Sequence, residues 1–575
     1  LDWMGLPDFD GGSVFSSLLD KSRGGYWRIG PEVPVLGHQR YIEDTAVLVS
    51  EWDLDGARLE LTDAMAWPED ERREGLQDRR VVIRRLRCIR GDVGCSFDLY
   101  PTDDFAPVSS VRETDGGFTF TVAGGTFGLW TTFPVRIEGG TVRVSIQLGA
   151  GEEAWAVLSW DEPPSAWSVS RARAALEDTA SYWRNCLSRL NLPETCPPRI
   201  KRSAMLVYLL TYAPQGSVVA APTTSLPERI GGDRNYDYRY SWVRDASLSM
   251  ATLGLLGDTP SAERYMGWLA RRDSSTESPL QVVYQVGGGT ELRQHERTDL
   301  EGYRGSLPVR FGNHAATQRQ LDSLGFLAEC ALVYLEQGGS WYEECWQTVR
   351  SAAEYTAQNW HKPDHGIWEL TQQRHYVSGK VMSWVALDRA LRIAERTGRI
   401  NETDDWAAVR ERIHAEVMEL GWSEGLGAFR QHYESDRLDA AALLVPVMGF
   451  LPPDHPRVLS TIERIEERLM TDGLVHRFPP DGAVSLGEFE GAFLPCTFWL
   501  AAAHALAGNV ERAERILERC ESLAGDLGVF AEEVDVRSSA FLGNTPLLFS
   551  QVEYVRARLE VARAQQASSE RTSAT

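Results

Sequence analysis

Hydrophobic and polar residues alternate along several short runs in the first part of the chain. Val142, Val144, Ile146 and Leu148 are separated by single polar residues, and Phe118, Phe120 and Val122 are separated by threonines. A period of two places the apolar side chains on one face of a strand. Glycine pairs at 116–117, 124–125 and 139–140 are typical turns between such strands. Residues 1–164 are therefore predicted to form an antiparallel β-sandwich.

The pattern changes to a helical period near residue 165. Residues 166–190 read as one helix, and Pro197–Pro198 mark the end of a helical linker spanning 165–197. Beyond this linker, three apolar stripes with helical spacing stand out. They comprise Trp406, Val409, Ile413 and Val417; then Val458, Leu459, Ile462, Ile465 and Leu469; and then Val510, Ala513, Ile516, Leu517 and Cys520.

About twelve helical segments are expected between residues 198 and 565. That number suits a double ring of inner and outer helices, an all-α (α/α)6 barrel. An α-solenoid has the same helical period, but no repeat at fixed spacing supports one. The polar residues 566–575 are predicted to form a disordered tail.

Composition excludes several classes of protein. The formal net charge is -23, and the sequence shows no basic patch of the kind that binds nucleic acid. No stretch reaches the roughly 18 apolar residues that a membrane span needs, and no signal peptide is visible. The eight cysteines form no CxxC pair, and several lie in apolar helical stripes, so we interpret them as reduced core residues. These features predict a cytoplasmic protein. Self-association through the sandwich remains an open alternative.

Four loops between apolar helices are rich in polar and aromatic residues, which is typical of functional loops. They span residues 231–245, 300–313, 365–370 and 530–535. In the first loop, arginine and aspartate could form bidentate hydrogen bonds to sugar hydroxyls, although a salt-bridged surface loop would look similar. The chain has 19 Trp, 18 Tyr and 19 Phe residues. Most must fill cores, but such rings also bind the apolar face of a pyranose.

Two glutamates are candidates for acid–base chemistry. Glu369 follows Trp368, and a carboxyl group beside a large apolar ring loses solvation, which would raise its pKa and suit a general acid. Glu532 lies in the acidic pair Glu532–Glu533 and could act as a base. Exposed charges are the alternative interpretation for both. Glycoside hydrolysis needs two such carboxyl groups on opposite sides of the scissile bond.

Five motifs, in order, resemble glycoside hydrolase family 15, the family of glucoamylases and bacterial trehalases. They are GGDRNYDYRYSWVRDAS from Gly231, LEGYRGSLPVRFGN from Leu300, HGIWE from His365, KVMSWVALDRA from Lys380 and FAEEVD from Phe530. The opening DWMGLP with FD and SVF is also similar to the start of the bacterial sandwich domain in that family. The resemblance covers nearly the whole chain.

The resemblance implies hydrolysis with inversion at a terminal α-glucosyl unit, with no metal or organic cofactor. It places Glu369 on the general acid and Glu532 on the general base. It places Arg244 and Asp245 on the pair that grips the terminal glucose. The remaining residues implied to bind substrate are Trp368, Tyr303, Arg304, Arg310, Trp242 and Tyr238.

One departure from the family changes the expected substrate. Fungal-type glucoamylases carry a second acid after the catalytic acid, whereas this chain has Leu370. A small α-glucoside is therefore favoured over starch, with trehalose ahead of isomaltose and maltose. The alternatives are a member recruited to a specialised metabolite, a phosphorylase and an inactive sugar-binding protein. Retention of both glutamates argues against the last two.

Overall fold

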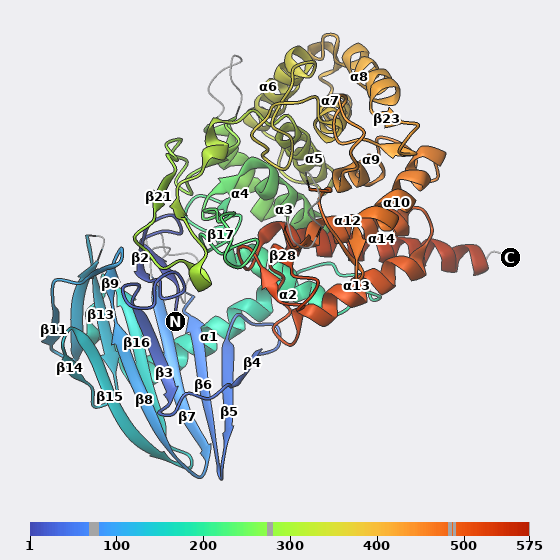
Figure 1. The fold of residues 1–575 in the computed structure, drawn as a ribbon. Helices are drawn as coiled ribbons and strands as arrows, with labels where there is room; N and C mark the ends of the chain where they lie inside the picture. Colours follow the sequence, from blue (N-terminus) through green and yellow to red (C-terminus); the bar gives the residue numbers. More distant parts are fainter. Residues whose placement is uncertain (68–79, 123, 273–279, 481–485, 487–489, 574–575) are drawn as a thin grey trace. The chain divides into compact units, whose positions relative to one another are not determined.

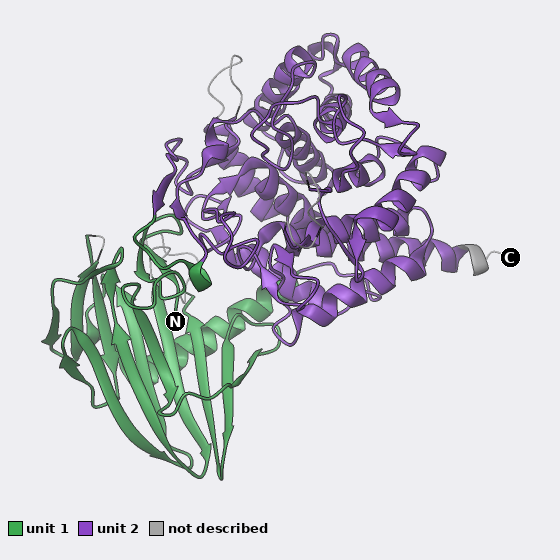
Figure 2. Cartoon of the chain, viewed as in Figure 1, with its two compact units in different colours: residues 1–189, 298–305 green, residues 190–297, 306–575 purple. Residues whose placement is uncertain are grey.

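The computed structural model describes residues 1–67, 80–122, 124–272, 280–480, 486 and 490–573 (Figure 1). These residues divide into two compact units (Figure 2). Unit 1 comprises residues 1–189 and 298–305, and unit 2 comprises residues 190–297 and 306–575. No helix within the described ranges is both long enough and apolar enough to cross a membrane.

Unit 1 contains two antiparallel sheets that share a hydrophobic core. The larger has the order β11 (Val111–Thr114), β12 (Gly117–Val122), β13 (Gly125–Thr131), β16 (Glu153–Trp160), β7 (Val81–Arg90), β6 (Ala57–Met65), β5 (Leu48–Leu54) and β4 (His38–Tyr41). The smaller has the order β14 (Arg136–Glu138), β15 (Thr141–Gly149), β8 (Asp92–Tyr100) and β3 (Tyr26–Pro31). Trp27 and Phe97 of the small sheet share one buried cluster with Leu86 and Phe127 of the large sheet. The N-terminal antiparallel domain expected from the alternating pattern is confirmed.

Helix α1 (Val169–Ser188) belongs to unit 1. Its Ala172 and Leu176 pack with Ile83 and Trp155 on the other face of the large sheet. The sequence predicted a linker at 165–197, separate from the sandwich. The structure instead places most of that segment in unit 1, because its apolar side covers sheet residues that would otherwise face water.

Unit 2 is helical, as the periodicity predicted. Its helices are α2 (Arg199–Leu209), α3 (Val243–Leu255), α4 (Thr259–Ala270), α5 (Asp322–Glu336), α6 (Glu343–Asn359), α7 (Val377–Thr397), α8 (Trp406–Leu420), α9 (Leu444–Val447), α10 (Pro456–Leu469), α12 (Leu494–Leu506), α13 (Val510–Ala524) and α14 (Leu548–Ser573). Helix contacts run from α3 through α5, α7, α9 and α12 to α14, and α14 also contacts α3. The other helices pack against this series; for example, α4 contacts α3, α6 contacts α7 and α13 contacts α12.

The predicted stripes mostly face inward. Trp406, Val409, Ile413 and Val417 are all buried in α8. In α10, Leu459 is 42% exposed although its stripe partners are buried, so its assignment to the core face was wrong. Helix α14 continues to Ser573, through most of the segment predicted to be a disordered tail. Hydrogen bonds such as Gln566 to Glu570 and Ser569 to the Gln565 carbonyl satisfy polar groups within this helix.

Candidate active site

The loop at 231–245 ends where α3 begins. Strand β19 (Ser241–Trp242) pairs with β20 (Val283–Tyr284) and is followed directly by the first turn of α3. Arg244 and Asp245 lie in that turn and are buried. An aspartate is favoured in a first turn because it faces the positive end of the helix dipole. This junction therefore fixes the arginine–aspartate pair at one end of a rigid element.

Glu369 lies in a tight turn with a left-handed backbone, at φ 58°. Its Oε1 accepts a hydrogen bond from Trp242 Nε1 at 2.7 Å, and Arg244 Nη1 lies 3.4 Å from the same oxygen. The side chain is 24% exposed, so its carboxylate is accessible. A non-glycine residue in this backbone region costs about 1–2 kcal/mol, and such strain is concentrated at functional sites.

Both carboxylate oxygens of Glu532 accept a hydrogen bond. Tyr238 donates its hydroxyl hydrogen to Oε1 at 2.7 Å, and the backbone N–H of Asn544 donates to Oε2 at 3.2 Å. Gly543 lies against the same carboxylate, since a Cβ at that position would stand 2.2 Å from Oε2. Contacts to both oxygens and the close approach of Gly543 constrain the orientation of this side chain.

Glu369 and Glu532 converge on one pair of aromatic rings. Tyr238 and Trp242 pack edge to face with ring centroids 5.7 Å apart. Each ring donates a hydrogen bond to a different glutamate. Burial raises the pKa of Tyr238 well above its usual value, and the charges of both glutamates add to this increase. The two acids, which are far apart in sequence, therefore lie around a common centre.

Arg244 and Asp245 form an ion pair beside Glu369. Arg244 Nε lies 3.0 Å from Asp245 Oδ2, and Arg244 Nη1 donates to the Ile367 carbonyl at 3.2 Å. Burial raises the pKa of Asp245, and the charge of Arg244 opposes that effect. Together the two side chains present donors and an acceptor of the kind that binds adjacent hydroxyl groups.

Trp368 and its sequence neighbour Glu369 have different contacts. Its indole N–H donates to both oxygens of Asp439, at 2.9 and 3.0 Å, and its ring packs against Phe493 and Trp499. Neighbours in sequence point in different directions within a tight turn. The Glu369 carboxylate accepts its hydrogen bond from the indole N–H of Trp242.

Three other predicted binding residues make different contacts. Tyr303 and Arg304 belong to unit 1, where the guanidinium of Arg304 lies 5.4 Å from the Tyr303 ring. Arg310 belongs to unit 2, and its Nη1 donates to the carbonyls of Asp233 and Asn235. Arg310 thus supports the loop that carries Tyr238, and among the described residues its side chain contacts Glu296, Asp233 and Asn235.

Glu532 lies in an environment that disfavours its charged form. Burial raises the pKa of Glu532 to about 8, and the charge of Glu228 contributes in the same direction. Hydrogen bonds from Tyr238 and Asn544 oppose this increase. The ionisation of the carboxyl group that the sequence analysis assigned as base is therefore displaced towards neutral pH.

An ionic network lies close to Glu532, and the sequence analysis did not find it. Arg477 contacts Glu228 at 2.9 Å, Glu490 at 2.7 Å and Glu533 at 3.3 Å. These three glutamates have oxygens within 4.8 Å of one another, which resembles a metal site, but the guanidinium supplies the positive charge. Arg477 also lies 5.7 Å from the Trp368 ring. Its sequence context, His-Arg-Phe in a loop before a helix, repeats the mixture of charge and aromatics of the four loops and could have identified it.

Comparisons with known proteins agree with this architecture. The family model for glycosyl hydrolases family 15 matches residues 199–559, and that for the trehalase-like N-terminal domain matches residues 1–161. The chain belongs to glycosyl hydrolase family 15. It is accordingly a glycoside hydrolase, and the resemblance drawn from the five motifs is confirmed.

Individual relatives extend the match to nearly the full chain. A trehalase of Mycobacterium tuberculosis is 34% identical, over 98% of this chain and 87% of the relative. A trehalase of Thermoplasma volcanium is 33% identical, over 97% of this chain and 89% of the relative. A solved bacterial glucoamylase in complex with acarbose superposes with a TM-score of 0.75 at 13% identity, covering 98% of this chain and 91% of its own. That likeness supports the fold alone.

Proposed function

We propose that the protein is an inverting, exo-acting α-glucosidase that hydrolyses a small α-glucoside, with trehalose as the favoured substrate. The observation that carries the proposal is the placement of Glu369 and Glu532 on the Tyr238–Trp242 ring pair. The similarity to trehalases over almost the whole chain supports the choice of substrate.

In this mechanism the two glutamates have opposite tasks. Glu369 gives its proton to the glycosidic oxygen as the bond from that oxygen to the anomeric carbon breaks. Water forms the new bond to the anomeric carbon from the other side, and Glu532 takes its proton. Tyr238 orients the Glu532 carboxylate, and Arg244 and Asp245 hold hydroxyls of the glucosyl unit. Proton exchange with solvent restores both acids.

The contact series α3–α5–α7–α9–α12–α14, with its return to α3, supports an inner ring of an (α/α)6 barrel. In that arrangement the junction before α3 and the turn at Glu369 lie at one mouth. A phosphorylase would not need a base, so the paired hydrogen bonds that orient Glu532 favour hydrolysis.

Proton NMR of fresh product tests the stereochemistry. Inversion of α,α-trehalose should release equal amounts of β-glucose, from the attacked unit, and α-glucose, from the leaving unit. Initial release of α-glucose alone would contradict the proposal, as would consumption of phosphate in place of water.

Activated substrates test the two roles separately. Glu369→Gln should lose trehalose hydrolysis by at least about 100-fold but retain much of its activity on α-glucosyl fluoride, because fluoride leaves without general-acid help. Glu532→Gln should lose both activities by a similar factor, because both need an activated water. If the two variants behave in the opposite way, the roles of the glutamates must be exchanged.

A further inference from the structure

The loop that carries Glu369 is closed at its base and strained at its tip. Asp364 and Arg374 exchange backbone hydrogen bonds of 3.0 and 2.8 Å, so residues 364–374 form one closed unit, here called the acid-bearing loop. Within it, the Glu369 N–H donates to the Gly366 carbonyl at 3.2 Å, and Glu369 has a left-handed backbone. A non-glycine residue keeps such a conformation when surrounding contacts over-determine it. Contacts from outside the loop must therefore contribute.

Residues 318–321, which lead into α5 and are here called the supporting segment, make such contacts. Gln318 Nε2 donates to the backbone carbonyl of Glu369 at 3.1 Å. The Leu321 N–H donates to Asp364 Oδ2 at 3.1 Å. The supporting segment therefore contacts the acid-bearing loop both at Glu369 itself and at the base of the loop.

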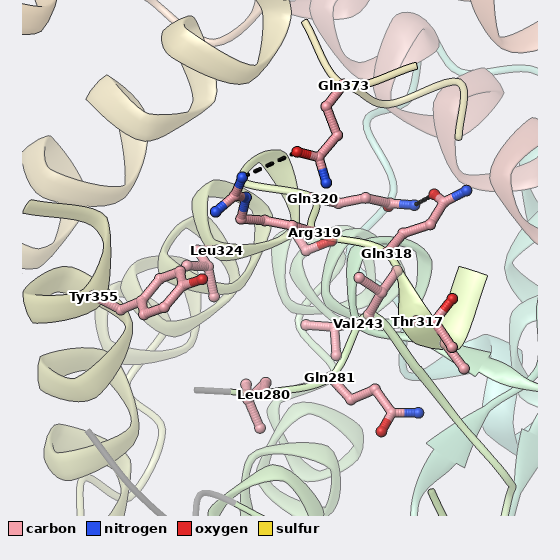
Figure 3. A pocket seen from close by; sticks show the side chains of 13 residues that line it. Val243, Leu280, Gln281, Thr317, Gln318, Arg319, Gln320, Leu324, Tyr355 and Gln373 are labelled. Atoms are coloured by element: carbon pink, nitrogen blue, oxygen red, sulfur yellow. Dashed lines mark hydrogen bonds between the residues drawn. The ribbon is translucent and has the colours of Figure 1, made fainter. Parts of the chain in front are cut away.

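Between these two points, Arg319 contacts the loop with its backbone and its side chain. It accepts a hydrogen bond from the His365 N–H at 3.0 Å, and its own N–H donates to His365 Nδ1 at 3.1 Å. Its Nη2 donates to Gln373 Oε1 at 3.2 Å, the bond between these two side chains that Figure 3 marks, and to the Pro363 carbonyl at 2.6 Å. The two segments are thus joined along their length, although 46 positions separate Arg319 from His365.

Asp364 is the buried anchor of this junction. It is 2% exposed, and burial raises the pKa of its carboxyl to about 7, with the charge of Asp322 acting in the same direction. Backbone hydrogen bonds from Leu321 and Gly366 oppose this increase. Asp364 therefore accepts from the supporting segment and from the acid-bearing loop. Hydrogen bonds to a carboxylate are among the stronger ones in proteins.

Gln318 also connects Glu369 to the arginine beside it. Gln320 Nε2 donates to Gln318 Oε1 at 2.9 Å, and Gln320 Oε1 lies 3.4 Å from Arg244 Nη1. The Gln318 amide thus donates with its nitrogen and accepts with its oxygen, which fixes its orientation. The position of the Glu369 backbone is therefore tied to that of Arg244.

We propose that Gln318 and Asp364 are positioning residues for the general acid, acting on the reaction through the backbone of the acid-bearing loop. The inference rests on the proposed function, in which Glu369 is that acid. Loss of either side chain would let the Glu369 carboxyl move, and a displacement of about 1 Å in a catalytic group can cost about 100-fold. A substrate whose leaving group needs no proton would be spared.

The test compares kcat for two substrates that share the glucosyl unit. One is trehalose, or whichever disaccharide the wild-type enzyme hydrolyses best, and the other is α-glucosyl fluoride, whose leaving group departs without general-acid help. The ratio of the two kcat values is the readout, because a partly unfolded preparation lowers both values equally and leaves their ratio unchanged.

Gln318→Met removes the hydrogen bond to Glu369 and keeps a side chain of similar length. Gln318 lines a cavity of about 440 Å³, so the methionine has room (Figure 3). We expect kcat for the disaccharide to fall by about 10-fold or more. For α-glucosyl fluoride it should stay within about 2-fold of the wild-type value.

Asp364→Ala removes the anchor at the base of the loop and should change the ratio in the same direction. Gln285→Met is the matched control for Gln318→Met. Gln285 is also half-buried, and its Nε2 donates to the Glu291 carbonyl at 3.3 Å. This control should leave both kcat values within about 2-fold of wild type.

A double variant shows whether the effect passes through the acid. In a Glu369→Gln background no acid remains to be positioned, so adding Gln318→Met should change kcat for the disaccharide by less than about 2-fold. A further loss of about 10-fold in that background would overturn the positioning role.

Equal losses on both substrates in Gln318→Met, or a wild-type ratio in that variant, would also overturn it. Failure of the wild-type enzyme to hydrolyse either compound, or wild-type turnover of the disaccharide by Glu369→Gln, would instead contradict the proposed function. The two failures are therefore distinguishable.

Discussion

At the scale of single residues, the site depends on how Glu532 is surrounded. It is buried, it accepts a hydrogen bond from Tyr238, and it lies near the charge of Glu228. Burial and that charge raise its pKa to about 8. Because a base must be ionised to take a proton, protonation of Glu532 should set the acidic limb of the pH profile of kcat/KM.

We therefore predict that Glu228→Gln moves this acidic limb to lower pH. Loss of the neighbouring negative charge lowers the pKa of Glu532, so the base ionises at lower pH, with a shift of about one pH unit. A pH series of kcat/KM measures the effect. Glu411→Gln, at a position with 66% side-chain exposure, is the control and should leave the profile unchanged. A limb that stays in place would show that another group controls it.

Gly543 gives a second residue-scale prediction. Gly543→Ala would place a methyl group 2.2 Å from Glu532 Oε2 and force the carboxylate to move. A misplacement of about 1 Å in a catalytic group can cost about 100-fold, so kcat should fall by about that factor while KM changes little.

Gly508→Ala provides the matched control for this change. Gly508 also has a positive φ, 84°, but no atom lies within 4 Å of its added Cβ. Both substitutions carry similar backbone strain, and Gly543→Ala adds the steric overlap with Glu532, so thermal unfolding should be measured for both variants. Wild-type kcat in Gly508→Ala, together with the loss in Gly543→Ala, would separate misplacement of the base from loss of stability.

At the scale of elements, helix α10 shows where the burial predicted from the sequence pattern differs from the actual packing. Its stripe included both Ile465, which is fully buried, and Leu459, which is 42% exposed. Ile465→Ala should lower the free energy of unfolding by about 2–5 kcal/mol. Leu459→Ala should change it by no more than about 0.5 kcal/mol. Denaturant titration measures both, and equal losses would restore the original interpretation of the stripe.

Much of the element structure follows from local pattern. Alternation at 142–148 and the stripe in α8 predicted correctly which side chains pack towards the core, because the period of a strand or helix fixes which side chains share a face. Motif resemblance identified Glu369 and Glu532 as candidates. Their meeting at Tyr238 and Trp242 required coordinates, because it depends on the path of loops that sequence spacing does not determine.

The sequence could not show in which direction the side chains of the loops point. Trp368 is adjacent to Glu369 in the chain, yet its N–H faces Asp439, while Trp242 reaches Glu369 from 127 positions away. Arg477 was missed for the same reason, since its three glutamate partners come from different segments. The sequence did not show that the helix after the sandwich belongs to the same compact unit, because an amphipathic pattern does not indicate which surface the helix will cover.

At the scale of the whole molecule, the formal net charge of -23 bears on the choice of substrate. A neutral disaccharide is not steered by this charge, whereas a charged metabolite would be attracted or repelled. We predict that kcat/KM for trehalose changes by less than about 2-fold between roughly 0.05 and 0.5 M NaCl, a range over which screening changes strongly.

Measuring kcat/KM for a set of candidate substrates at both salt concentrations checks this prediction. An ionised glucoside that is hydrolysed faster than trehalose, with strong salt dependence, would favour the recruited-metabolite alternative. The rates at which the wild-type enzyme hydrolyses a neutral trisaccharide at both salt concentrations serve as the control for the length of the substrate.

Tyr238 and Trp242 stand four positions apart on the segment that leads through β19 into α3, and each contacts a different carboxylate. One short stretch of backbone thus positions both the proposed proton donor and the proposed proton acceptor. A substitution that shifts the backbone of residues 238–242 would displace the hydrogen-bond donors of Glu369 and Glu532 together. Turnover should therefore be more sensitive to changes in these few residues than to changes of equal size in either glutamate-bearing loop.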